Sequence, residues 1–168
     1  MDFFELIRAR QSMRAYTPQP VEPEKERAIL EAANSAPSAG NKQSYKIFAV
    51  TSRDALRALG EGRAYFDHIP LALVFCAAPT LAAEKFGERG ERLYCIQDAT
   101  IACTYAQLAA CALGLASCWI GRLEADAVRQ AIGATEELLP IAILPIGYAA
   151  ETPERKPRIS LDELVKHV

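Results

Sequence analysis

The sequence lacks the usual sets of catalytic side chains. Its 168 residues include only two histidines, His68 and His167, and these lie far apart along the chain. A Ser-His or Cys-His catalytic pair therefore has little support. Neither an H-x-x-x-H pair nor a calcium-loop spacing is present, which argues against a metal site. We expect no catalytic side chain and no metal ligand.

An excess of positive charge is also missing. The chain has 19 Lys and Arg against 21 Asp and Glu, without the basic surplus typical of nucleic-acid-binding proteins. The N-terminal residues 1–10 carry charges within their apolar part and no cleavage site, so they are not a signal or transit peptide. Residues 97–116 approach a membrane span in length, but Asp98, Gln107 and other polar residues make insertion costly. These features favour a cytoplasmic protein that contacts neither nucleic acid nor membrane.

Cysteine pairs are absent too. The five cysteines are odd in number, lie in apolar segments and include no C-x-x-C pair. Their spacing is wider than that of zinc or iron–sulfur ligands. We therefore expect five reduced core thiols, which are Cys76, Cys95, Cys103, Cys111 and Cys118.

The apolar residues are sufficient for one domain over residues 1–168. They make up 51% of the chain, enough to bury a real core at this length. An N-terminal helix is predicted from a capping box between Asp2 and Glu5. The stripe of this helix that we expect to be buried is Phe3, Leu6 and Ile7.

Hydrophobic patterns and turn residues predict the other elements. Further helices are expected from Pro23 to before Pro37, from Ser52 to Gly60, from 126 to Gly133 and after Ser160. Strands are expected at residues 46–51, 71–77, 117–121 and 141–148, and the second is apolar on both faces, as in the centre of a sheet. Because helices and strands do not alternate regularly, the pattern favours an α+β fold.

Residues 97–116 form the most unusual segment, an Ala-, Cys- and Leu-rich helix with Asp98 as its one charge. A helix that is apolar nearly all round must be buried on nearly all sides. One domain of this size has difficulty surrounding such a helix alone. The segment therefore predicts a homodimer built around this helix, with burial in a monomeric core as the alternative.

Four polar segments rich in hydrogen-bond donors punctuate this apolar chain. They are the Arg10-Ser12-Arg14 cluster, residues 37–43, residues 117–121 and residues 155–158. Together they suggest a bound molecule with a phosphate at one end and a flat heteroaromatic ring at the other. The bound cofactor would then supply the reactivity.

Several motifs resemble those of the nitroreductase family of FMN-dependent NAD(P)H oxidoreductases. RQSMRAY, APSAGNKQSYKIFAV, the segment DATIACTYAQLAACALGLASCWIG and the closing ILPIGYAAETPERKPRISLDELV are similar to its motifs, in its order and over nearly the whole chain. The resemblance implies a central, mixed but mostly antiparallel sheet flanked by helices, with a long buried helix at the core of a homodimer.

The resemblance also implies that FMN lies at the dimer interface and touches both chains. Arg10, Ser12, Arg14 and Arg158 would hold its phosphate, while Arg8 would stay on the surface. The full set of implied cofactor-binding residues is Arg10, Gln11, Ser12, Arg14, Pro37, Ser38, Ala39, Asn41, Gln43, Ser117, Cys118, Trp119, Ile120, Gly121 and Arg158. Ser44 and Tyr45 depart from the family pattern, which has Pro and Trp there.

The implied reaction is a ping-pong transfer in which NAD(P)H reduces FMN and leaves, and a nitroaromatic, quinone or similar small acceptor then takes the same place. A non-enzymatic dimer that stores or senses flavin is an alternative, because the same contacts serve binding alone. A flavin-free helical interaction domain is a third interpretation.

Overall fold

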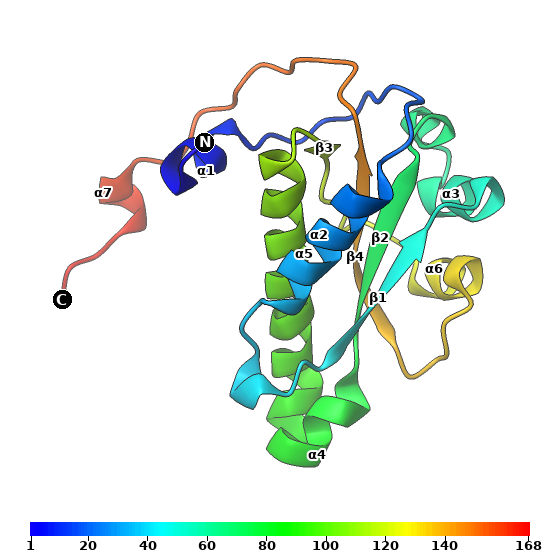
Figure 1. Cartoon of the computed structure of the whole chain (residues 1–168). Helices are drawn as coiled ribbons and strands as arrows, with labels where there is room; N and C mark the ends of the chain where they lie inside the picture. The colour runs from blue at the N-terminus through cyan, green and yellow to red at the C-terminus, as the bar shows by residue number, and fades with distance from the viewer.

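The computed structural model describes all residues, 1–168, and is built on one four-stranded sheet (Figure 1). The strands are β1 (Tyr45–Val50), β2 (Leu71–Ala77), β3 (Ala116–Ser117) and β4 (Leu139–Gly147), in the order β1-β2-β4-β3. Every pair is antiparallel, and a single parallel bridge joins Ser12 to Ser117. The α+β fold with a mixed, mostly antiparallel sheet is thus confirmed.

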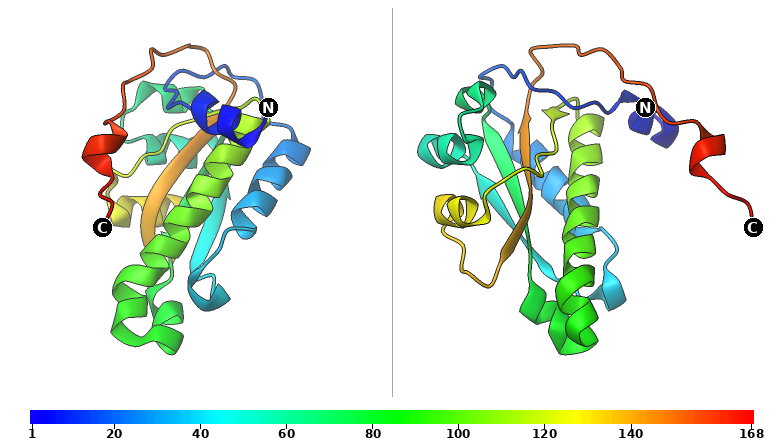
Figure 2. Two further views of the ribbon diagram at one scale, coloured as in Figure 1. Left: turned by 90° about the vertical axis from the view of Figure 1, so that its left-hand side faces the viewer. Right: turned by 180° about the vertical axis from the view of Figure 1, so that it is seen from behind.

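Strand β2 divides the core into two layers. All seven of its residues are buried, as predicted for a central strand. Side chains alternate along a strand, so Leu71, Leu73 and Phe75 join one hydrophobic cluster, whereas Ala72, Val74 and Cys76 join the other. Figure 2 shows the result: helices cover both faces of the sheet, and apolar strand residues pack on each side.

Helices α2 (Pro23–Asn34) and α5 (Cys95–Ala112) cover the first face. Helix α2 ends before Pro37, as predicted, and buries Ile29 and Ala33. The second face carries α3 (Arg53–Gly60) and α6 (Ala125–Ile132), together with the short 3-10 turn η2 (Ala64–Asp67). Gly60 was predicted to end its helix, but it lies inside α3, and Glu61 takes the left-handed conformation instead.

The long apolar helix differs from its predicted bounds. It begins earlier, because α4 (Pro79–Arg89) runs through a π-helical turn η3 (Gly90–Tyr94) into α5. It also ends at Ala112, because Gly114 has a φ of 77° and β3 begins at Ala116. The predicted buried character is confirmed for the face that meets the sheet, where Ala99, Ala102 and Ala106 are fully buried.

The N-terminal helix α1 (Phe3–Ala9) forms with the predicted Asp2–Glu5 capping box. Its predicted buried stripe is wrong, however, because no residue of α1 is buried and Phe3 is 62% exposed. The C-terminal helix α7 (Leu161–Leu164) is also exposed. Figure 1 shows α1 and α7 away from the sheet, and the 90° view in Figure 2 shows that they are also apart from each other, so these exposed apolar residues do not cover one another.

No helix combines the length and hydropathy needed to cross a membrane. The five cysteines are free thiols; four of them are buried, as predicted, whereas Cys111 is only partly buried because it lies near the exposed end of α5. No cluster of three or more His, Cys, Asp or Glu side chains is placed to hold a metal ion.

Candidate functional site

The first part of the site is a cleft between the N-terminal segment and the C-terminal tail. The two run antiparallel: Thr17 N–H donates to the Tyr148 carbonyl at 2.9 Å, and Ala150 N–H donates to the Ala15 carbonyl at 3.0 Å. Further along, the Arg155 guanidinium donates to the Arg8 carbonyl. Two distant segments are therefore held face to face above the sheet (Figure 2).

This cationic cleft has a volume of about 500 Å³ and a strongly positive lining. Its charged residues are Arg8, Arg10, Arg14, Glu154, Arg155, Lys156 and Arg158. None of its six cations forms an ion pair, although seven other Lys and Arg residues of the chain do. Arg8 is exposed, as expected for a surface residue, and it also lines the cleft.

The cleft brings together the predicted phosphate ligands Arg10, Ser12, Arg14 and Arg158, with Gln11, which was predicted to bind the cofactor without a stated role. The backbone conformation explains why the side chains of Ser12 and Arg14 lie on the same side of the N-terminal segment. Met13 packs against the core and its N–H donates to the Ser117 carbonyl at 3.0 Å. In a nearly extended segment the neighbours at alternate positions, Ser12 and Arg14, then point away from the core.

The segment after α5 borders the same end of the molecule. Residues 117–121 were predicted to be a strand, but only Ala116 and Ser117 are in β3, and Ile120 makes an isolated bridge to Ile143. Ser117, Cys118 and Ile120 are at most 6% exposed, whereas Trp119 is partly exposed and Gly121 is exposed. The backbones of Ser117 and Ile120 are already bonded to Met13 and Ile143, so the exposed surface of this segment is at Trp119 and Gly121.

The electrostatic environment of this segment is positive. Burial raises the pKa of the Cys118 thiol, while the charges of Arg14, Arg10 and Arg63 oppose the rise. Burial likewise raises the pKa of the Cys111 thiol, and Arg10 again opposes it. The two thiols thus indicate that arginine charge acts on the end of α5 and on the following segment, which favours an anionic ligand there.

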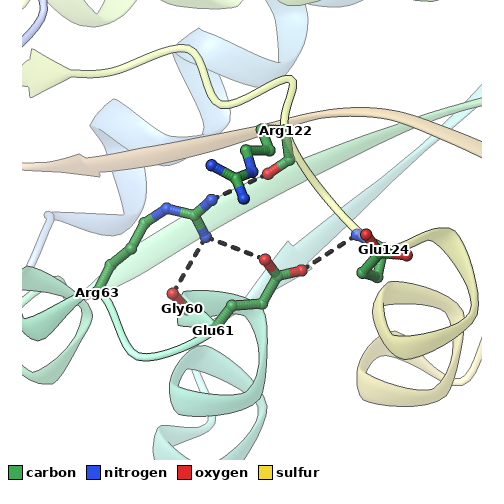
Figure 3. Close-up of polar contacts among 5 residues, drawn as sticks. All are labelled: Gly60, Glu61, Arg63, Arg122 and Glu124. Carbon is green, nitrogen blue, oxygen red and sulfur yellow. Dashed lines mark hydrogen bonds and ion pairs between the residues drawn. The ribbon is translucent and has the colours of Figure 1, made fainter.

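A polar clamp fixes the chain immediately beyond Gly121 (Figure 3). The Arg63 guanidinium donates to the carbonyls of Gly60, at 3.1 Å, and Arg122, at 2.9 Å. The Glu61 carboxylate accepts from the Glu124 N–H at 3.1 Å. The turn after α3 therefore holds the segment that follows residues 117–121, although these clamp residues carry no motif that could have identified them from the sequence.

The second part of the site is the loop of residues 37–43, which a buried carboxylate shapes. Asp98 is 2% exposed and accepts hydrogen bonds from Ala39 N–H, at 2.9 Å, and Ser44 N–H, at 3.3 Å. The Ser38 hydroxyl accepts from Gln43 N–H at 3.0 Å. Asp98, the one charged residue of α5, thus anchors this loop.

The loop backbone is tightly turned. Gly40, Asn41 and Gln43 all have positive φ values, a region that glycine and asparagine tolerate best. Lys85 donates to the Gly40 carbonyl at 2.8 Å. The Gln43 side chain points back to Asn34, at 3.3 Å from its side-chain oxygen, so in this chain it is engaged with α2.

Next to the loop lies a groove of about 450 Å³. Its lining is mostly apolar or uncharged and combines the loop with the first turns of the long helix: Pro37, Ser38, Ala39, Tyr94, Gln97, Asp98, Thr100 and Ile101. Tyr94 is braced by an edge-to-face contact with Phe86 at 5.2 Å and by Arg89, which donates to its hydroxyl at 3.0 Å. Asp98, Tyr94 and α4 had no role in the sequence-based prediction, because only the three-dimensional structure brings them to the loop.

The two parts of the site lie at opposite ends of α5. Asp98 anchors the loop near the start of the helix, whereas Ser117, which the Ser12 segment contacts, follows its last residue, Ala112. The helix between Asp98 and Ala112 spans about 20 Å at a rise of roughly 1.5 Å per residue. One chain therefore assembles the predicted cofactor-binding residues at two separate places: a cationic end and a loop end.

Comparison with known proteins identifies the relatives of this chain. The model of the nitroreductase family matches residues 7–69 and 62–148. The FMN reductase [NAD(P)H] of Bacillus subtilis is 30% identical over 172 residues, which cover 93% of this chain and 69% of that protein. The oxygen-insensitive NADPH nitroreductase of Salmonella typhimurium is 30% identical over 173 residues, 97% of this chain and 72% of that protein.

Solved structures agree with these relatives. A nitroreductase family protein from Clostridium difficile has 31% sequence identity and a TM-score of 0.88, with 99% of this chain and 98% of that chain covered. The family model and the sequence relatives both span most of the chain. On this evidence the protein belongs to the nitroreductase family, a family of flavin-dependent NAD(P)H oxidoreductases.

Proposed function

We propose that the protein is an FMN-dependent oxidoreductase that uses NAD(P)H to reduce small acceptors such as quinones and nitroaromatics in a ping-pong cycle. The observation that carries this proposal is the cationic cleft, in which six unpaired cations surround a hydroxyl and an amide in a family of flavin enzymes. When bound, FMN accepts a hydride from the nucleotide and passes electrons to the acceptor.

The cleft has the chemistry needed for the FMN phosphate. Planar guanidinium groups bind a phosphate dianion bidentately, and Ser12 adds a neutral donor. Arg10 and Arg14 come from the N-terminal segment and Arg158 from the tail, so the phosphate would join both sides of the cleft. Exposure of these arginines in the ligand-free chain fits a site that is neutralised only when an anion binds.

The flavin ring would lie against the backbone of residues 117–121. This segment continues from the Ser12–Ser117 bridge, and the Arg63 clamp fixes its far end. The main-chain N–H groups of Trp119 and Gly121, which the Ile120–Ile143 bridge leaves free, would donate to the ring, and the nearby arginine charge would stabilise the negative charge that develops near N1 and O2 on reduction. No side chain of the protein needs to act as an acid or base.

The loop end would complete the site from a second chain. A two-fold axis across the middle of α5 reverses the helix direction, so it brings the cationic end of one chain to the loop end of its partner. Pro37, Ser38, Ala39 and Asn41 would then reach a flavin whose phosphate the other chain holds. Such an arrangement accounts for two half-sites about 20 Å apart in one chain.

The outer stripe of α5 supports this homodimer. Gln97, Thr104, Tyr105 and Ala112 are exposed at helical spacing and none of them is charged. The side-chain nitrogen of Gln107 is buried beside this stripe without an acceptor, which is rare unless a partner supplies one.

The exposed apolar residues of α1 and the tail would be covered in the same assembly. These residues are Phe3, Phe4, Ile7, Ile159, Leu161, Leu164 and Val165. An apolar patch of this kind typically marks an interaction site.

The test is an anaerobic titration of the purified protein after loading with FMN. We expect NADH or NADPH to bleach the flavin absorbance and a quinone or nitroaromatic to restore it. Arg14→Ala should lower the flavin content, whereas Arg92→Ala, which changes an exposed arginine paired with Glu88 at 2.9 Å, should not. A flavin that neither nucleotide reduces would indicate storage or sensing instead, and no FMN binding at all would refute the proposal.

A further inference from the structure

The cationic cleft carries more positive charge than one phosphate can neutralise. Six cations and one acid, Glu154, leave its lining with a formal charge of +5. A phosphate monoester brings about −1.5 to −2 charges at pH 7. A cleft filled by the FMN phosphate would therefore retain about three positive charges, in a protein whose net charge is −2.

No acid of the chain neutralises this surplus. None of the six cations takes part in an ion pair. Glu151, which precedes the cleft residues in the tail, accepts from the main-chain N–H of Arg14 and not from a guanidinium. Like charges held together repel one another, so a second anion would stabilise the cleft.

The surplus is concentrated in one part of the cleft. Arg155 donates to the main-chain carbonyl of Arg8, which brings its guanidinium to the last turn of α1, and the side chains of both arginines line the cleft there. The segment of Arg10 and Arg14 is held instead against Ser117, beyond the end of α5, by the Ser12–Ser117 bridge and by the hydrogen bond from Met13 N–H to the Ser117 carbonyl. The cleft therefore has two centres of positive charge, and FMN has only one phosphate to offer them.

We propose that Arg8 and Arg155 form a second phosphate subsite, and that it binds the 2′-phosphate of NADPH. This inference rests on the proposed function, because the dinucleotide must stack on a flavin whose own phosphate occupies the Arg10–Arg14 centre. Two guanidinium groups suit a phosphate monoester, which NADPH carries on its adenosine ribose and NADH lacks. The subsite thus makes NADPH the preferred reductant.

The test uses the full-length, FMN-loaded protein and measures binding by isothermal titration calorimetry. The probes are adenosine 2′,5′-bisphosphate and adenosine 5′-monophosphate, which differ by the 2′-phosphate. The Arg8→Gln/Arg155→Gln variant is compared with Arg27→Gln/Arg92→Gln, which removes the same charge from exposed arginines paired with Glu31 and Glu88. We expect the first variant to bind the bisphosphate about tenfold or more weakly, at unchanged FMN content, and the second to bind it normally.

The other possible results of the calorimetry also bear on the proposed subsite. An equal loss for both nucleotides would support a second phosphate subsite but assign it to the 5′-phosphate side that NADH and NADPH share. Unchanged affinity for both nucleotides, with FMN retained, would overturn the inference.

Failure of the proposed function can be distinguished from these results. If FMN does not bind, inorganic pyrophosphate is titrated into the flavin-free protein instead. Weaker binding to Arg8→Gln/Arg155→Gln than to the control variant would still support the subsite, and equal binding would refute it.

Discussion

The two ends of helix α5 are built on different physical principles. At the cationic end, exposed arginines from two antiparallel segments crowd together without a partner acid. At the loop end, the buried carboxylate of Asp98 fixes a tight turn through two main-chain hydrogen bonds. The first end is poised to gain energy from a ligand, whereas the second is already organised before any ligand arrives.

This contrast indicates how the two halves of a shared site divide their roles. An exposed charged cluster gives affinity and attracts an anion over a distance, but it holds little shape by itself. A turn anchored by a buried carboxylate has a fixed shape but little free charge. Variants at one end should therefore change binding, and variants at the other should change stability.

Removal of the Asp98 carboxylate should give the largest effect. Asp98→Ala leaves the N–H groups of Ala39 and Ser44 without their acceptor in a buried place. We expect the free energy of unfolding to fall by about 2–5 kcal/mol, as measured by urea denaturation. Asp126→Ala is the control, because Asp126 is 94% exposed in its pair with Arg129 and should cost less than about 0.5 kcal/mol. Similar losses in the two variants would contradict the anchoring role of Asp98.

At the other end, Arg14→Ala should weaken FMN binding by about ten- to a hundredfold, because a charged hydrogen bond to phosphate is lost. The unfolding free energy of the ligand-free protein should change by less than about 1 kcal/mol, since the Arg14 side chain has no ion pair to lose. Fluorescence titration of FMN at two salt concentrations measures the first effect, which added salt should reduce. A large loss of stability in the ligand-free variant would contradict the idea that the cationic end contributes to binding and the loop end to stability.

At alkaline pH, buried thiols near the two ends of α5 should contribute by different amounts to the pH dependence of stability. Burial raises the pKa of Cys76, which pairs with the strand that follows the loop, from 9.0 to about 11. Because the unfolded thiol loses its proton first, the stabilisation is complete below about pH 9 and is lost as the pH rises to about 11, at about 1.4 kcal/mol per pH unit for one thiol.

At Cys76 only Arg129 opposes the rise in pKa, whereas at Cys118 Arg14, a hydrogen bond with Ser12, Arg10 and Arg63 all oppose it, so Cys118 should contribute less. Urea unfolding from pH 8 to about pH 11 should therefore show a shallower loss of stability for Cys76→Ala than for Cys118→Ala. The reverse order would show that the arginines do not govern the electrostatics of their end.

The smallest effect is expected at Gly40, where φ is 51°. Gly40→Ala should cost about 1 kcal/mol from backbone strain, and slightly more because the new Cβ would lie 2.6 Å from the Lys85 ammonium. Gly133→Ala is a matched control, with a φ of 64° and no atom within 4 Å of the new Cβ. The new Cβ at Gly40 would also lie 2.9 Å from Phe86 Cζ, so the difference between the two unfolding free energies measures the close packing of Lys85 and Phe86 on the loop, and equal values would show that this packing adds no cost.

Sequence patterns predicted the strands of the sheet and the cationic end of the site far better than the loop end. Strand β2 was predicted from its continuous apolar run, β4 from its apolar residues and the end of α2 from Pro37, because each of these signals is local in the sequence. The clustering of Arg10, Ser12 and Arg14 was also readable, since an extended segment places alternate residues on one side. The family resemblance then linked this cluster to Arg158.

The features that the sequence did not predict depend on contacts between segments that are distant in the chain. Asp98 looked like a stray charge in an apolar helix, because the loop that it anchors lies about sixty residues earlier in the chain. The Arg63 clamp and the Tyr94 wall had no local signature for the same reason. The exposed stripe of α1 was predicted wrongly because a 3.6-residue period indicates an apolar face without saying which chain covers it.

The end of α5 also has a consequence for the order in which the protein folds and acquires its cofactor. The last carbonyl groups of a helix carry a partial negative charge of about half an electron, and Arg10 acts on Cys111 within the last turn of α5. The helix macrodipole therefore offsets part of the repulsion within the arginine cluster, by about 0.3–1 kcal/mol for a nearby cation. With this fixed counter-charge built into the backbone, the chain can fold first and take up its anionic cofactor afterwards.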